Sequence, residues 1–146
     1  MRHSRKNRKN FSMLRKINLS AAIIVLICFF LPWEQVSCGG AKDTLTGLDL
    51  ARDIHGILWL VPALMMIIIL LGLLRSWKDR MQTFAIVSLI CGAISAALMN
   101  RERLRVHDES GVISAQLTGW FWLAFISVFA LVISAIGMLL RRQRSQ

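Results

Sequence analysis

The chain has 146 residues, of which 55% are hydrophobic, and its mean hydropathy is +0.56. A soluble domain of this length does not carry so much apolar sequence in long uninterrupted blocks, so composition excludes an ordinary soluble globular protein. The net charge of +10 comes from Lys and Arg residues that flank the apolar blocks. This placement favours the lipid bilayer and its anionic headgroups as the partner, and not nucleic acid, for which no binding module is recognisable.

The chain begins with a basic segment over residues 1–16, followed by an apolar stretch over residues 17–33. This order predicts a cytoplasmic N-terminal segment and a first membrane span. A signal peptide cleaved before Cys38, whose thiol would then carry a lipid, is the alternative. Gln35 stands where such a cleavage site requires an aliphatic residue, so an uncleaved span is favoured.

Three further apolar stretches cover residues 56–74, 83–99 and 119–140, and a basic tail covers residues 141–146. A helix needs about 20 apolar residues to cross the hydrocarbon core, and only helices satisfy their own backbone hydrogen bonds there. The sequence therefore predicts an all-α transmembrane protein whose four-helix bundle forms a membrane domain over residues 17–140.

Orientation follows from the distribution of Lys and Arg. Most of these residues lie in the N-terminal segment, in the connection over residues 75–82 and in the C-terminal tail. We therefore expect both termini to be cytoplasmic and the loops after the first and third spans to be outside. None of the four spans contains Asp, Glu, Lys, Arg or His, which argues against a proton-coupled transporter or an intramembrane enzyme.

The two outer loops carry strand-like patterns. In the first loop, Gly39-Gly40 separates two short alternations of polar and apolar residues, which is typical of a hairpin. In the second loop, residues 104–107 and 112–118 flank a turn cluster over residues 108–111. We expect the two hairpins to pair into a small β element that caps the outer face of the bundle; two irregular loops are the alternative.

The two halves of the chain are weakly similar to each other. Residues 22–28 resemble residues 85–91, and residues 45–47 resemble residues 117–119, in the same order. Each half would then be a helix, an outer loop and a helix, as in a tandem repeat. Chance similarity between apolar sequences is an equal alternative.

The candidate interaction residues lie in and beside the first outer loop. Thr46, followed three residues later by Asp49, is typical of a helix N-cap with an acid in the first turn. Asp49, Asp53 and His55 are also a conceivable divalent-metal site, but the capping interpretation is favoured, and we expect no catalytic residue, metal or cofactor. We expect the outer interaction surface to comprise Trp33, Cys38, Gly39, Gly40, Asp49 and Asp53.

Cys38 is the one thiol that we expect outside the membrane. It has no partner cysteine in an outer loop, so it is free, capped or bridged to another chain. We favour a free thiol next to a Gly-Gly turn.

Small residues recur at helical spacing in the last two spans, where they let helix backbones approach closely. We expect helix packing, within the chain or in a homo-oligomer, through Ser88, Gly92, Ala96, Ser127, Ala130, Ser134 and Gly137.

One stretch carries a family resemblance. Phe30-Leu31-Pro32-Trp33, then Ser37-Cys38-Gly39-Gly40, then Thr46-Gly47-Leu48-Asp49-Leu50-Ala51 resembles the LPW…SCGG…TGLDLA pattern of small bacterial four-span membrane proteins. The resemblance covers about residues 29–51 and implies a multi-pass protein of the bacterial inner (plasma) membrane. It implies no activity.

These observations together predict a non-enzymatic integral membrane protein that binds a partner protein or an envelope component through its outer loops. A subunit of a small oligomeric transporter or channel is the alternative, and a thiol-dependent enzyme that uses Cys38 is a third.

Overall fold

The computed structural model describes residues 2–38, 41–54, 56–73, 81–109 and 114–143. This part of the chain is mostly helical. Its elements, in chain order, are α1 (Arg2–Phe29), β1 (Pro32–Cys38), β2 (Ala41–Thr46), the short α2 (Gly47–Asp49), a π-helical turn (Leu50–Ile54), a 3₁₀ turn (Gly56–Trp59), α3 (Leu60–Leu73), α4 (Met81–Glu109), β3 (Ser114–Leu117) and α5 (Gly119–Gln143).

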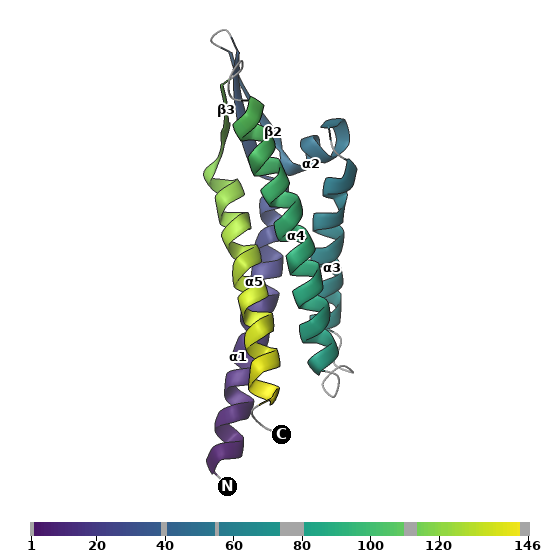
Figure 1. Ribbon diagram of the computed structural model, residues 1–146, viewed down its shortest axis with the longest axis vertical. Coiled ribbons are helices and arrows are strands. Elements are labelled where there is room, and N and C mark those ends of the chain that lie inside the picture. Colours follow the sequence, from purple (N-terminus) through teal and green to yellow (C-terminus); the bar gives the residue numbers. More distant parts are fainter. Residues whose placement is uncertain (1, 39–40, 55, 74–80, 110–113, 144–146) are drawn as a thin grey trace.

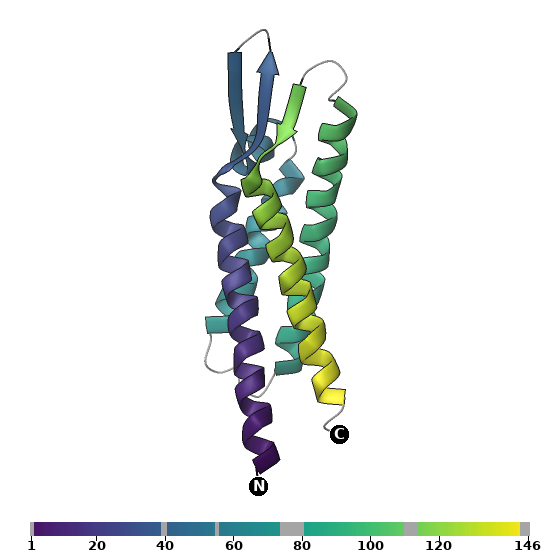
Figure 2. The ribbon, with the colours of Figure 1, turned by 90° about the vertical axis from the view of Figure 1, so that its left-hand side faces the viewer.

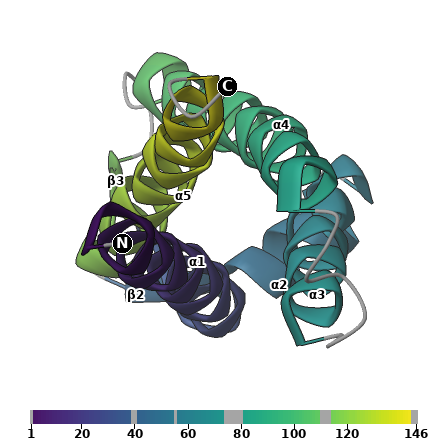
Figure 3. The ribbon, with the colours of Figure 1, turned by 90° about the horizontal axis from the view of Figure 1, so that it is seen from below.

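The four long helices form a ring around a shared core (Figure 3). α1 packs against α5 and α3, and α4 packs against the same two helices. The sheet lies at one end of this bundle, and the first residues of α1 and the last residues of α5 lie at the other end (Figures 1 and 2). We call these the sheet end and the terminal end of the bundle.

Three helical segments of the described chain are long and apolar enough to cross a membrane. They are Gly56–Leu73, Gln82–His107 and Gly119–Leu140, whose 18-residue apolar stretches have mean hydropathies of 2.6, 1.9 and 2.7. Their outward faces carry many exposed large side chains, such as Ile90, Ile126 and Ile133. Serines are buried between the helices instead, among them Ser88 and Ser134. An apolar exterior around a partly polar interior is the arrangement expected of a membrane protein.

The first apolar stretch ends differently from the prediction. We expected a span over residues 17–33, whereas α1 ends at Phe29 and Pro32 begins β1. Proline removes a backbone donor and disfavours helical geometry in the residue before it. The helix therefore closes with short turns, in which the amides of Phe30 and Leu31 donate to the carbonyls of Ile27 and Cys28.

The third helix is longer than predicted. We expected a span over residues 83–99 and a strand over residues 104–107, and the predicted strand is wrong because α4 continues to Glu109. Met99, Glu102 and Val106 are buried at helical spacing, which shows that this segment packs one face of a helix against the rest of the chain.

The sheet has three strands in the order β2-β1-β3, and both pairings are antiparallel. The predicted first hairpin is confirmed, with Cys38 opposite Ala41, although its Gly39-Gly40 turn lies outside the described residues. The second predicted hairpin contributes only β3, because its first half is helical. The small sheet predicted from the two loops is therefore confirmed with one strand fewer.

Each half of the described chain runs helix, strand, helix, with α1 and α3 around the β1–β2 hairpin and α4 and α5 around β3. This order agrees with the predicted repeat. The duplication itself stays a prediction.

Candidate functional site

Trp33 attaches the sheet to the helix bundle at the start of β1, which we call the base of the sheet. The register between β1 and β2 shifts between Pro32 and Glu34, as in a β-bulge, and the Trp33 side chain between them is fully buried. Its indole Nε1 donates to the Cys28 carbonyl at 2.7 Å. Its rings meet those of Phe29 and Phe121 edge to face, with centroids 5.5 and 5.4 Å apart. Trp33 therefore joins the sheet to both α1 and α5.

Thr118, just before α5, also attaches the base of the sheet to the bundle. Its backbone amide donates to the Trp33 carbonyl at 2.9 Å, and its hydroxyl donates to the Pro32 carbonyl. Gly47 packs nearby, because a Cβ at this position would lie 2.7 Å from the Phe29 carbonyl oxygen. The strands therefore leave the bundle in a fixed direction.

A charged triad ties β1 to the sheet end of α4. The Arg105 guanidinium lies 3.2 Å from a carboxylate oxygen of Glu34 and 2.9 Å from one of Glu102. The two carboxylate side chains are only 4% and 3% exposed, and the arginine side chain is 17% exposed. Two largely desolvated carboxylates thus share the Arg105 cation, which offsets part of the cost of burying their charge.

Asp49 closes a capping box with Thr46, as the capping interpretation predicted. The Asp49 amide donates to the Thr46 hydroxyl oxygen at 3.1 Å, and Asp49 Oδ2 accepts from the Thr46 amide at 3.0 Å and from its hydroxyl at 2.6 Å. These hydrogen bonds lower the pKa of the Asp49 carboxyl below its ordinary value, with a smaller contribution from Arg52. The side chain of Asp53, and His55, lie outside the described part of the chain.

The remaining candidate interaction residues are Cys38, Gly39 and Gly40, at the turn between β1 and β2. The backbone of Cys38 ends β1, while its side chain and Gly39-Gly40 lie outside the described residues. Within the described residues, no three His, Cys, Asp or Glu side chains form a group that could hold a metal ion.

The predicted small-residue face of α4 lies in a helix contact. A Cβ at Gly92 would lie 2.8 Å from both Leu131 Cδ2 and Val132 Cγ2 of α5. Ser88 is fully buried, and the partly buried Ala96 packs against the core.

The predicted face of α5 divides between two environments. Ser134 is buried against α1, where Asn18 Nδ2 donates to its hydroxyl at 3.0 Å and to the Leu131 carbonyl at 3.3 Å. A Cβ at Gly137 would meet Leu14 of α1 at ordinary van der Waals distance. Ser127 is buried, with its hydroxyl donating to the Leu123 carbonyl, whereas Ala130 is exposed.

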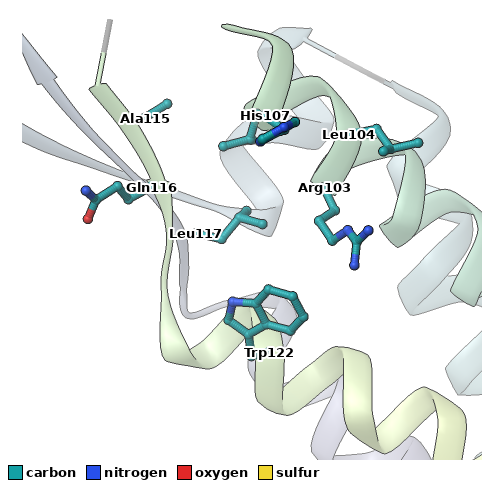
Figure 4. A pocket seen from close by; sticks show the side chains of 8 residues that line it. Arg103, Leu104, His107, Ala115, Gln116, Leu117 and Trp122 are labelled. Carbon is teal, nitrogen blue, oxygen red and sulfur yellow. The ribbon is translucent and has the colours of Figure 1, made fainter. Parts of the chain in front are cut away.

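A pocket of about 520 Å³ opens beside the sheet, between the sheet end of α4, β3 and the first turn of α5 (Figure 4). Arg103 and His107 extend into it from α4, and Leu117 and Trp122 face it from the other side.

Sequence reasoning missed this pocket and the charged triad, because both depend on α4 continuing past Met99. The spacing of Glu102 and Arg105, three residues apart as in a helical ion pair, is the signal that was available.

Comparisons with protein-family models, with curated proteins and with solved structures gave no match. The candidate site therefore rests on its geometry alone.

Proposed function

We propose that this chain is a non-enzymatic four-span protein of the bacterial inner membrane, with both termini in the cytoplasm and the sheet outside. We propose further that the sheet binds a partner protein or another envelope component.

A fourth span formed by α1 is supported by its outward face. Ile23, Ile24 and Ile27 of α1 are exposed, as are large apolar side chains of the other long helices, which supports a place for α1 in the same apolar belt. An even number of spans also agrees with the two helix ends lying together at the terminal end (Figure 2). The Lys and Arg residues within residues 2–16 and 141–143 at this end favour the cytoplasmic side.

The observation that carries the binding proposal is the rigid attachment of an open-edged sheet. Trp33, Thr118 and the charged triad hold β1 in place, and β2 forms an edge whose Lys42, Asp43 and Thr44 are exposed. Binding surfaces held in one conformation lose less conformational entropy when a partner docks. An edge strand also offers backbone donors and acceptors to an added strand.

Site-specific photo-crosslinking in intact cells tests the binding proposal. A photoreactive residue at Thr44, on β2, is expected to give a discrete crosslinked product. The matched control is Thr83, which is equally polar and exposed but lies at the terminal end of α4. The binding proposal fails if Thr44 gives no product or the same products as Thr83.

The orientation is tested separately by thiol labelling in a Cys38→Ser background. An impermeant reagent is expected to label Lys42→Cys in intact cells and Thr83→Cys only after permeabilisation. Labelling of Thr83→Cys in intact cells contradicts the proposed topology.

A transporter or channel subunit is the second candidate, and the buried polar groups of the bundle favour it. Asn18 Oδ1, Ser88 Oγ and Ser95 Oγ are buried and have no hydrogen-bond partner in the described structure. Such groups are the kind that bind a polar solute or water inside a bundle. Solute flux into proteoliposomes that Asn18→Leu abolishes would favour this candidate over the first.

A further inference from the structure

The pocket beside the sheet combines a cationic side with an apolar side. Arg103 and His107 line it from α4, and Gln116 lines it from β3. Its remaining lining residues are apolar or aromatic: Leu104, Val106, Ala115, Leu117 and Trp122. Among the described residues that line the pocket, Arg103 is a cation and no side chain is a carboxylate, so their charge favours an anion.

Arg103 is the group that defines the chemistry. It is exposed and makes no hydrogen bond or ion pair with any residue that the structure describes. Arg105, two residues further along α4, is instead held by Glu34 and Glu102. The guanidinium of Arg103 therefore has all its donors available, and its planar fork matches two oxygens of a phosphate.

The pocket lies where the apolar belt meets the polar sheet end. Trp122 is in the first turn of α5, and the exposed Leu123 and Ile126 continue the same helix into the belt. An indole at such a position prefers the boundary between hydrocarbon and headgroups. A ligand in the pocket would thus have its anionic part beside Arg103 and an apolar part against Trp122 and the belt.

We propose that this pocket binds the phosphate headgroup of one anionic phospholipid from the leaflet nearest the sheet. The inference rests on the protein lying in a bilayer and is independent of what the sheet binds. A lipid fits better than a soluble anion because the pocket is open and is continuous with the apolar belt, so the acyl chains stay in hydrocarbon while the phosphate reaches Arg103.

Native mass spectrometry of the purified protein, released from detergent micelles doped with phosphatidylglycerol, tests the proposal. Arg103→Gln is expected to weaken retention of the most tightly bound lipid by about tenfold, as loss of a charged hydrogen-bonding partner does. Arg101→Gln is the matched control, because Arg101 is exposed on the same helix and does not line the pocket. Phosphatidylcholine is expected to be retained less than phosphatidylglycerol by the native protein.

Three results would overturn the proposal. Equal losses in Arg103→Gln and Arg101→Gln would mean that only overall charge attracts lipid, and no loss in either would mean that the pocket holds none. Displacement of the lipid by inorganic phosphate alone would identify a soluble anion as the occupant.

Thermal unfolding of both variants at the same temperature as the native protein checks that the fold is intact. Arg103→Lys keeps the charge but not the planar fork of the guanidinium, so it is expected to retain an intermediate amount of lipid. A negative photo-crosslinking result at Thr44 leaves this lipid measurement unchanged.

Discussion

Arg105 of α4 and Glu34 of β1 form an ion pair across 71 positions of the chain, at 3.2 Å, which joins the sheet to the third long helix. Glu102 completes the triad from one turn earlier on α4. The pair joins the sheet to α4, whereas Trp33 joins it to α1 and α5. Its strength depends on a cation placed between two carboxylates that are almost fully removed from solvent.

Replacement of Arg105 is therefore expected to destabilise the protein more than replacement of other arginines nearby. Arg105→Gln removes a cation that the buried Glu34 and Glu102 share, and this loss is expected to cost about 3 kcal/mol. Thermal unfolding in detergent measures the change. The triple variant with Glu34→Gln and Glu102→Gln is expected to recover part of the loss, since no buried charge remains, and Arg101→Gln is expected to change little. Equal stability of Arg105→Gln and Arg101→Gln would contradict this role.

Gly92 is expected to tolerate no larger side chain. A Cβ there would lie 2.8 Å from Leu131 and Val132, so Gly92→Ala is expected to cost about 1–3 kcal/mol by overpacking, and Gly92→Leu more. The matched control is Gly119→Ala, at the start of α5, where nothing lies within 4 Å of the added atom. Unfolding midpoints in detergent compare the variants. The close α4–α5 contact is refuted if Gly92→Ala and Gly119→Ala unfold alike.

Trp33 combines a hydrogen bond with aromatic packing, and two substitutions separate these contributions. Trp33→Phe keeps a ring but removes the donor to the Cys28 carbonyl, and about 1 kcal/mol is expected to be lost. Trp33→Ala also removes the contacts with Phe29 and Phe121 and is expected to cost about 3–5 kcal/mol. Trp120→Phe, at an exposed indole, is the control. Similar losses in Trp33→Phe and Trp33→Ala would show that the aromatic packing contributes nothing.

The capping box of Asp49 predicts a pH dependence. The folded pKa of this carboxyl lies below its ordinary value of 3.8, because Thr46 donates hydrogen bonds to the ionised form. The stabilisation is therefore complete above pH 3.8 and is lost as the pH falls through the lower folded pKa. Carboxyl titration by nuclear magnetic resonance is expected to show the pKa of Asp49 rising in Thr46→Val. An unchanged titration in that variant would exclude Thr46 as the cause.

Sequence predicted those features of this structure that depend on neighbours in the chain. The Gly39-Gly40 pair indicated the hairpin. Thr46, with Asp49 three residues later, indicated a helix N-cap at Thr46. Gly92 was identified because close helix contacts need small residues, whatever the partner helix.

The remaining features depend on contacts that no local pattern encodes. Residues 104–107 alternate in polarity as a strand does. Met99, Glu102 and Val106 share the buried face of α4, but the charged Glu102 interrupts the apolar pattern by which a helix is recognised in the sequence. Asn18 reaches Ser134 across 116 positions, and a regular small-residue spacing in α5 could not reveal that Ala130 faces outward. The pocket beside Arg103 forms only when α4, β3 and α5 meet.

The strand order determines when each strand of the sheet can pair during synthesis of the chain. β1 lies between β2 and β3, and β2 follows it at once, whereas β3 belongs to the second half of the chain. A nascent chain with only its first half inserted therefore carries one edge of β1 unpaired until residues 114–117 emerge. During that interval the exposed edge can pair with the β3 of another copy, because its own β3 is not yet present. Swapped dimers are thus the expected misassembly product of slow synthesis between α4 and α5.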